Sequence, residues 1–434
     1  MADLKQTAVK LFHSTLAAID IPATMERKLA RRGAKMHVAG AKVDLSGINE
    51  VVVIAFGKAG YAMVEGARRV LEPDYRCEGI LSVPAPPPKQ PQGFQVFLAG
   101  HPVPNPASLA AGEAILARLS KCTENTLVLF LLSGGGSALV EKPLFDGVTL
   151  ADVQALNRTL VTCGAPIDEI NAVRKHFSAI KGGRLAAAAA ASLKITLGVS
   201  DVPEGRESAL ASGPTIPDPT TVADALHVVE QYKLRDKLPA ALRAHLDALP
   251  ETPKPGDPAF ARNHFQLLLG LQDLFEPAKR LAEQAGFVAV TDNSTDDWPL
   301  AKAADALLAR LVQLKNENPS KPVAVIADGE VSSPVTGDGT GGRNSAFVLD
   351  CVEKIAARRI AVASAGTDGV DGNSPSAGAA ADGDTLDRAR KAGLDPGDYF
   401  QRSDAYSFFS KLGDAIETGP TGNNLRDLRI FLAE

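Results

Sequence analysis

Short apolar runs alternate with amphipathic, alanine- and leucine-rich stretches along most of this chain of 434 residues. Most of the apolar runs are continuous, which is typical of parallel strands that are covered on both faces. The runs that predict strands are 51–56, 79–83, 94–98, 127–132, 194–199, 265–269, 287–290, 322–327, 360–364 and 429–432. Strands of this kind separated by helices predict an α/β fold.

Helical spacing of apolar residues fills the intervals between these runs. The predicted helices span 61–71, 108–119, 151–161, 276–285, 301–314 and 344–357. The first twenty residues form a further amphipathic helix. They lack a basic segment followed by a continuous apolar core, so they do not resemble a secretion signal.

Two proline-rich segments, 214–219 and 250–258, bracket a mostly helical stretch. A chain of this length suits two hydrophobic cores. We therefore expect one domain over residues 1–250 and a second over residues 251–434.

The composition excludes several classes of partner. Hydrophobic residues make up 45% and charged residues 22% of the chain, and the net charge is −5, which gives no basic face for nucleic acid and no polybasic membrane anchor. No apolar stretch is long enough to span a bilayer. Four well-separated cysteines without a C-x-x-C pair indicate reduced thiols. We expect a cytoplasmic protein, a monomer or homodimer, that acts on a small molecule.

Three apolar runs end in glycine-rich turns. The first turn contains Lys58 in AFGKAG, the second is the run Ser133, Gly134, Gly135, Gly136 and Ser137, and the third ends in GGRN with Arg343. Such turns expose backbone N–H groups that bind phosphate, and Lys and Arg match phosphoryl charge. The pattern indicates an enzyme that transfers a nucleotide's phosphate. A solvated lysine beside a turn is an equal alternative for Lys58, and a flexible linker is the alternative for the serine–glycine run.

Positive charge gathers on both sides of a glycine pair, at Arg174, Lys175, Lys181 and Arg184, with Gly182 at the break. The ordinary interpretation of such a run is a solvated helix face. The break between two helical patterns favours a bend near a ligand instead.

Acidic residues follow three of the predicted strands, at Asp201, Glu330 and Asp368. Ligands of open α/β sheets bind beyond the carboxyl ends of strands, and carboxylates there can hold a Mg²⁺ ion that bridges phosphates. The alternative is turn capping, a common role of aspartate.

Other enzyme motifs are absent from the sequence. There is no G-x-x-x-x-G-K-[ST], no H-R-D or D-F-G set, and no His/Cys metal spacing. A G-x-G-x-x-G match at 337–342 lies too far from its strand for a dinucleotide fingerprint.

With these residues identified, the chain resembles the class II glycerate 2-kinases, whose C-terminal half carries the MOFRL motif. The resemblance covers nearly the whole length and rests on the order and spacing of many motifs. They are AFGKAG, HPVP, LSGGGSAL, INAVRKHFSAIKGGRLA, SDV, ASGPTIPDPTT, GGRN, AGTDGVDG and TGPTGNNLRDL.

The resemblance implies a larger Rossmann-like N-terminal domain, a smaller C-terminal α/β domain with a mixed sheet, and a site in the cleft between them. It also implies ATP- and Mg²⁺-dependent phosphorylation of the 2-hydroxyl of D-glycerate. The family's proposed active-site lysine, aspartate and arginine fall on Lys58, Asp201 and Arg343.

We combine the resemblance and the residue patterns into one set of expected roles. The catalytic residues are Lys58, Asp201 and Arg343; the phosphate ligands are Ser133, Gly134, Gly135, Gly136, Ser137, Lys181 and Gly182; the substrate ligands are Lys58, Arg174, Arg343 and Asn344; the metal ligands are Asp201, Glu330 and Asp368.

The sequence departs from the family pattern at Arg206, where the family has an acidic residue, and at Ser345 and Ala346, where it tends to have Gln-Glu. These departures bear on nucleotide preference and substrate more than on the reaction class. Two other functions stay open: an NAD(P)H-dependent hydroxypyruvate reductase, and a non-catalytic sensor that binds a phosphorylated ligand.

Overall fold

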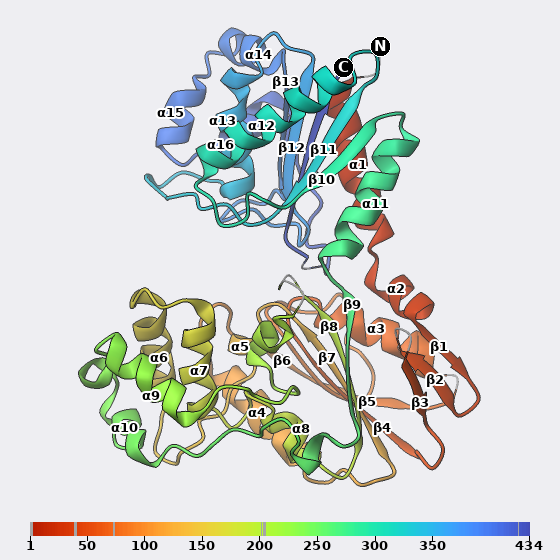
Figure 1. Cartoon of the computed structure of the whole chain (residues 1–434), viewed down its shortest axis with the longest axis vertical. Helices are drawn as coiled ribbons and strands as arrows, with labels where there is room; N and C mark the ends of the chain where they lie inside the picture. The colour runs from red at the N-terminus through yellow and green to blue at the C-terminus, as the bar shows by residue number, and fades with distance from the viewer. Residues whose placement is uncertain (1–2, 39–40, 73, 201, 203–204, 424) are drawn as a thin grey trace. The chain divides into compact units, whose positions relative to one another are not determined.

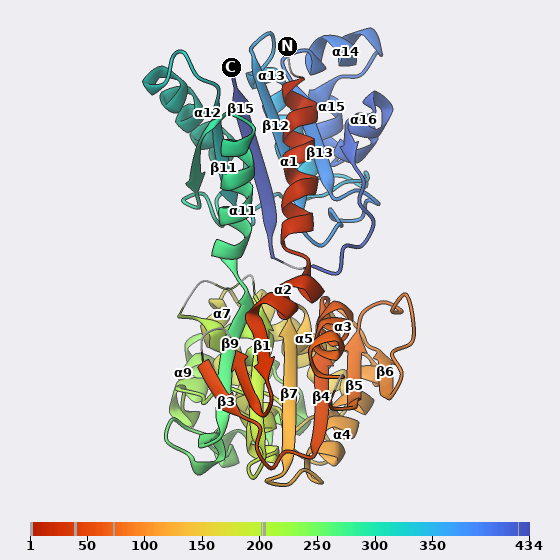
Figure 2. The same ribbon diagram turned by 90° about the vertical axis from the view of Figure 1, so that its right-hand side faces the viewer.

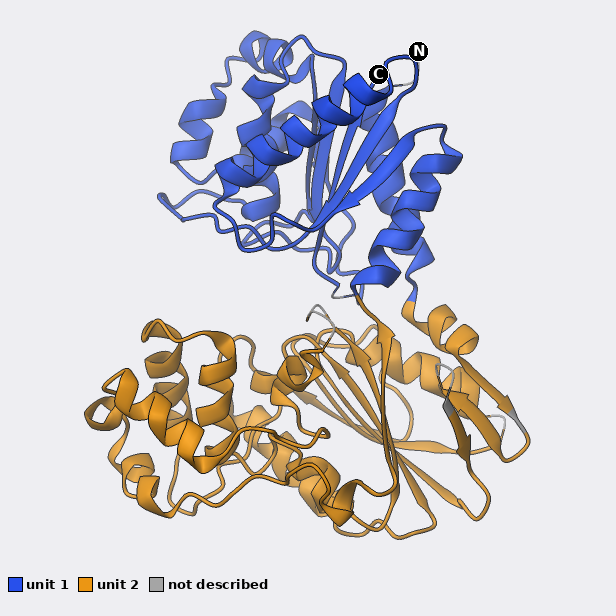
Figure 3. Ribbon diagram, in the orientation of Figure 1, with its two compact units in different colours: residues 1–20, 271–434 blue, residues 21–270 orange. Residues whose placement is uncertain are grey.

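A computed structural model of the chain describes residues 3–38, 41–72, 74–200, 202, 205–423 and 425–434 (Figure 1). The chain divides into two compact units, which Figure 3 distinguishes by colour. Unit 2 contains residues 21–270, and unit 1 contains residues 1–20 together with 271–434.

Unit 2 is built on a six-stranded parallel sheet in the order β6-β5-β4-β7-β8-β9. Its strands are β4 (Glu50–Phe56), β5 (Cys77–Val83), β6 (Phe94–Leu98), β7 (Thr126–Ser133), β8 (Leu193–Val199) and β9 (Asn263–Leu269). Taken in sequence, these strands lie in the order 3-2-1-4-5-6, which is the Rossmann order. The expected Rossmann-like N-terminal domain is therefore confirmed.

Helices cover this sheet and extend beyond it. They are α2 (Ile21–Lys28), α3 (Gly60–Leu71), α4 (Pro106–Leu119), α5 (Gly136–Leu139), α6 (Leu150–Thr162), α7 (Ile167–Phe177), α8 (Arg184–Ala188), α9 (Val222–Gln231) and α10 (Ala240–Arg243). Alternate residues of β4 and β7, including Ile54 and Phe130, share a buried cluster with Ile115 of α4 and Leu185 of α8. A second cluster joins α6, α7 and α9.

A small antiparallel sheet of β1 (Leu29–Arg32), β2 (Lys35–Val38) and β3 (Ala41–Asp44) precedes the parallel sheet. These three strands were not predicted from the sequence. Each is only four residues long, and no two large apolar residues are adjacent between residues 29 and 44, so the segment lacks the continuous runs that identify the other strands.

Unit 1 contains a mixed sheet in the order β10-β11-β15-β12-β13-β14, as expected for the C-terminal domain. Its strands are β10 (Val288–Asp292), β11 (Val323–Asp328), β12 (Ile360–Gly366), β13 (Gly378–Asp382), β14 (Ala415–Ile416) and β15 (Asp427–Ala433). Its helices are α1 (Leu4–Ala18), α11 (Leu271–Gln284), α12 (Leu300–Glu317), α13 (Arg343–Lys354), α14 (Thr385–Lys391), α15 (Pro396–Gln401) and α16 (Ala405–Leu412).

The last strand, β15, lies between β11 and β12 and is antiparallel to both. The carboxyl ends of β11 and β12 therefore lie at the edge where β15 begins. Asp328 is opposite Leu428 on one side, and Gly366 is opposite Asp427 on the other. This register brings residues from distant parts of the sequence to one edge of the sheet.

The expected division into residues 1–250 and 251–434 differs from the two observed units. β9 pairs in parallel with β8, so it completes the sheet of unit 2 and moves the boundary to residue 270. Helix α1 belongs to unit 1, where it packs on β12 and β15 beside α11 (Figure 2). An amphipathic pattern shows that a helix has a buried face, but it does not show which distant sheet covers that face.

No helix among the described residues combines the length and the apolar character that a membrane span requires.

Candidate active site

The first two glycine-rich turns lie side by side in unit 2. They follow β4 and β7, the neighbouring strands at which the strand order of the sheet reverses. In open α/β sheets, ligands bind outside the carboxyl ends of strands at this reversal. We call the segments 57–60 and 133–137 the switch-point turns.

The switch-point turns are bonded to each other through their backbones. The N–H of Lys58 donates to the carbonyl oxygen of Gly134 over 2.9 Å, and the N–H of Ala59 donates to the hydroxyl of Ser133 over 3.0 Å. The backbone of Lys58 is thus fixed against the serine–glycine run.

Close packing explains why glycine occupies these turns. Gly57 has φ of +127°, and a Cβ there would lie 2.1 Å from the hydroxyl oxygen of Ser133. A Cβ on Gly135, at φ of +84°, would lie 2.9 Å from the His101 ring. At these two positions, neighbouring parts of the protein fill the space that a side chain would need.

A left-handed segment lies against the second turn. Ala211, Ser212 and Gly213 have φ of 50°, 60° and 62° in succession. Non-glycine residues in this region are strained, and such strain concentrates at functional sites. The Ser212 hydroxyl bonds with the Ser137 hydroxyl over 2.8 Å and with the Asn171 side-chain oxygen over 3.1 Å. This network holds Ser137 in place.

Two of the predicted cations in 174–184 are buried in ion pairs. Lys181 is 2% exposed and pairs with Glu141, and Lys175 pairs with Asp218 over 3.0 Å. Burial lowers the pKa of Lys181, while Glu141 opposes that shift. The interpretation of this charged run as a solvated helix face is therefore wrong for these two lysines. The backbone N–H of Gly182 donates to the carbonyl of Ser212, so the glycine pair is bonded to the left-handed segment.

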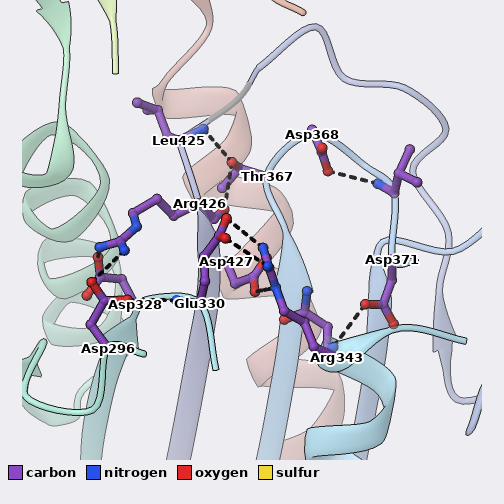
Figure 4. Close-up of polar contacts among 12 residues, drawn as sticks. Asp296, Asp328, Glu330, Arg343, Thr367, Asp368, Asp371, Leu425, Arg426 and Asp427 are labelled. Atoms are coloured by element: carbon purple, nitrogen blue, oxygen red, sulfur yellow. Dashed lines mark hydrogen bonds and ion pairs between the residues drawn. The ribbon is translucent and has the colours of Figure 1, made fainter. Parts of the chain in front are cut away.

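In unit 1, carboxylates on two sides hold Arg343. Its Nε donates to Asp427 over 2.6 Å and its Nη1 donates to Glu330 over 2.8 Å (Figure 4). Burial lowers the pKa of Arg343, but the attraction of Asp427 and Glu330 outweighs it and raises the pKa above its ordinary value. The Asp427 side chain is 4% exposed, whereas that of Glu330 is 42% exposed.

A second arginine, Arg426, binds two further carboxylates at the same sheet edge. It contacts Asp296 over 2.5 Å and Asp328 over 3.3 Å (Figure 4). Its backbone is left-handed, with φ of 86°, and its carbonyl accepts bonds from the N–H and the hydroxyl of Thr367. Burial and the nearby Asp296 raise the pKa of Asp328 to about 6, although Arg426 opposes this.

We call these residues, with Arg429, the carboxylate–arginine cluster; its members are Asp296, Asp328, Glu330, Arg343, Arg426, Asp427 and Arg429. Arg429 is fully buried in β15, donates to the backbone oxygen of Asp328 over 3.0 Å and stacks on the ring of Phe347. Arg343 and Glu330 were identified from the sequence, but Asp296, Asp328, Arg426, Asp427 and Arg429 were not given a role. The one available signal in the sequence was Arg429, a charged residue among the apolar residues of β15.

The N-terminus of α13 is capped by the chain itself. The Asp371 carboxylate accepts bonds from the N–H groups of Asn344 and Ser345 over 2.9 and 2.8 Å. This carboxylate occupies the position at which a helix N-terminus would bind an anion. Asn344 is 1% exposed and its amide oxygen accepts a bond from Ser364, so it joins α13 to β12. Its use as a substrate ligand stays a prediction.

The predicted metal ligands do not form a cluster in the described residues. Asp201 lies outside them. Glu330 bonds to Arg343, and Asp368 accepts a bond from the N–H of Val370 over 3.1 Å. Within the described part of the chain, no group of three or more His, Cys, Asp or Glu is placed to hold a metal ion. The metal assignment stays a prediction.

Comparison with known proteins finds two family models along the chain. A model described as "Domain of unknown function (DUF4147)" matches residues 7–247, and the MOFRL family model matches residues 323–427.

Relatives match over most of the length. A "D-glycerate 2-kinase" of Thermotoga maritima is 36% identical over 89% of this chain and 91% of its own. A protein of Agrobacterium vitis named "Putative hydroxypyruvate reductase" is also 36% identical, over 94% of each chain. The crystal structure of a glycerate kinase from Thermotoga maritima superposes with a TM-score of 0.86 at 32% identity, covering 99% of each chain.

Proposed function

The chain belongs to the class II glycerate 2-kinase family, which carries the MOFRL domain, and we propose that it transfers the γ-phosphoryl group of ATP to the 2-hydroxyl of D-glycerate. The observation that carries this proposal is the pair of switch-point turns. Two glycine-rich turns bonded to each other at the strand-order reversal, with Lys58 on one of them, suit a phosphate chain laid across that edge.

In this proposal the substrate hydroxyl attacks the γ-phosphorus in line, ADP leaves, and the hydroxyl proton passes to a base. Such a transfer depends on positioning and on charge neutralisation. Lys58 contributes its ammonium beside the switch-point turns, Arg343 contributes its guanidinium, and Asp201 orients the attacking hydroxyl.

The two carboxylates on Arg343 suggest different roles. The buried Asp427 bond fixes the guanidinium in one orientation. The Glu330 bond is exposed to water, and exposed ion pairs contribute only about 0–1 kcal/mol. Arg343 can therefore exchange Glu330 for phosphoryl oxygens at little cost while it keeps Asp427.

The proposed Mg²⁺ would be held by oxygen ligands from Asp201, Glu330 and Asp368. Carboxylate oxygens suit the ion, which usually takes one or two carboxylates in addition to substrate phosphates, so one or two of these three side chains would be enough. Release of Glu330 from Arg343 would provide one such carboxylate. When bound, the ion neutralises charge on the phosphate chain.

Some of the remaining predicted ligands keep their roles as proposals, and two are given an indirect role. Arg174 is a candidate for an anionic group, and the run from Ser133 to Ser137 is a candidate for the phosphates. Lys181 and Gly182 support the turn through Glu141 and Ser212, so we assign them an indirect part in phosphate binding. We place the reaction in the cytoplasm.

The test measures ADP release with D-glycerate. Lys58→Met and Arg343→Gln should each lower kcat by a factor on the order of 10²–10⁴, because each removes a charge that stabilises the transition state. Lys89→Met and Arg390→Gln change exposed side chains outside the site and should leave kcat at the parental value. Parental kcat in both site variants would refute the assignment.

The name of the Agrobacterium relative makes a hydroxypyruvate reductase the second candidate. The turn after β4 reads Gly57, Lys58, Ala59 and Gly60, which is shorter than a dinucleotide fingerprint. NADH or NADPH consumption with hydroxypyruvate, without ADP release from D-glycerate, would establish this alternative.

A further inference from the structure

Unit 2 contains a pocket of about 290 Å³ beside the second switch-point turn. Its walls come from α6 and α7, from residues 102–104 after β6, and from Ser137 and Ala138 of α5. Because Ser137 belongs both to the pocket and to the turn, the pocket is continuous with the proposed phosphate site. We call it the α6–α7 pocket.

Two arginines, Arg158 and Arg174, lie on the wall of this pocket. Within the described part of the chain, neither the Arg158 nor the Arg174 guanidinium makes a hydrogen bond or an ion pair, and the buried Nε of Arg174 is unsatisfied. The nearby Glu141 is already paired with Lys181. Burial lowers the pKa of Arg174, and the attraction of Glu141 offsets only part of this effect. A half-buried cation whose nearby carboxylate is already bound to another cation is costly, which indicates that an anion completes the site.

Part of the pocket wall is apolar. Val103 and Val161 on this wall are 51% and 64% exposed, and Pro102 and Pro104 also line the pocket. The side-chain amide of Gln154 donates to the Pro104 carbonyl over 2.8 Å and fixes the segment 102–104. Exposed apolar side chains on a pocket wall are typical of ligand contacts.

These features suit a ligand with a flat apolar part and an anionic part. A three-carbon hydroxy acid has no apolar face to place against the valines and would fill little of the volume. A nucleotide has both parts. The side chain of Asn157, which also lines the pocket and has no partner among the described residues, supplies a neutral hydrogen-bonding group for the edge of a base.

We propose that the α6–α7 pocket binds the nucleoside end of ATP, with the base against Val103 and Val161 and with Arg158 and Arg174 facing the start of the phosphate chain. The chain then runs past Ser137 to the switch-point turns. This inference rests on the proposed kinase function and adds residues that set nucleotide affinity.

The experiment compares the parent with Arg158→Glu/Val161→Asp. Both side chains are exposed on α6, so the substitutions leave the core intact. Calorimetric titration with ADP, in the absence of glycerate, should show at least tenfold weaker binding. The KM for ATP should rise by a similar factor, and the KM for D-glycerate should stay within twofold. Ile167→Asp and Arg243→Ala, exposed and outside the pocket, should match the parent.

The outcomes separate this proposal from the kinase assignment. Unchanged ADP affinity in a variant that still phosphorylates glycerate would overturn the pocket assignment and leave the kinase function intact. A rise in the glycerate KM alone would make the pocket a substrate subsite, which also overturns it. Arg158→Ala and Val161→Asp, tested singly, provide the same comparison should the double variant fail to fold, and each should weaken ADP binding at least threefold.

Discussion

Unit 2 and unit 1 hold their candidate site residues in opposite ways. At the switch-point turns, hydrogen bonds of the backbone hold the two segments together. Because Gly57 and Gly135 have no side chain, their backbones lie close to Ser133 and His101. At the carboxylate–arginine cluster, ionised side chains hold one another, as Arg343 and Asp427 do. The first arrangement depends on the absence of side-chain atoms and the second on the balance of charge, so different substitutions should break them.

Asp427→Asn should give the largest loss of stability. It removes the buried carboxylate that binds Arg343 and lies 3.6 Å from Arg429, which leaves buried positive charge uncompensated. Breaking a buried pair in this way costs about 3–5 kcal/mol. Calorimetric unfolding should show the loss, while Asp398→Asn, in an exposed pair with Arg402, should change little. Equal stability of the two variants would contradict the account of unit 1.

Gly57→Ala should have the next largest effect. The new Cβ would meet Ser133, and the backbone conformation strains any L-residue, for a combined cost of about 2–4 kcal/mol. Gly164→Ala is the matched control, because Gly164 is left-handed at φ of +85° but has no neighbouring atom within 4 Å of the added carbon. It should lose about 1–2 kcal/mol. An equal loss at both positions would show that close packing of the turns contributes nothing.

Asp328→Asn tests the charge balance of the carboxylate–arginine cluster through the pH dependence of the free energy of unfolding. The folded-state pKa is about 6 against an ordinary 3.8, so Asp328 contributes stability that is fully present below about 3.8 and is lost as pH rises through about 6. The contribution is at most about 3 kcal/mol. The difference in unfolding free energy between parent and Asp328→Asn should therefore fall between pH 4 and pH 6.5. A difference that does not change over this range would rule out the raised pKa.

Much of the fold follows from the sequence, because continuous apolar runs identify strands that are buried on both faces. All ten predicted strand positions coincide with strands, and the turns at Lys58 and Ser133 lie where those strands end. β13 was missed because its sequence, GAAAD, contains no large apolar residue. Strands β11 and β15 of the same sheet bury Val, Ile or Leu side chains and were predicted.

The partners in the carboxylate–arginine cluster could not be predicted. Arg343 and Asp427 are 84 residues apart and meet because β15 inserts between β11 and β12. Strand order in a mixed sheet depends on tertiary packing and leaves no periodic signal in the sequence. The same applies to Asp371, whose role as the cap of α13 depends on a loop that returns to the helix from 26 residues away.

The position of α1 has a consequence for biosynthesis. This helix is translated before unit 2, but two of its packing partners, β12 and β15, are translated only after the whole of unit 2. Until then its apolar residues, Leu11 and Phe12 among them, have no native sheet to cover. We expect nascent chains to complete unit 2 first, while α1 stays without its sheet and is a candidate for chaperone binding.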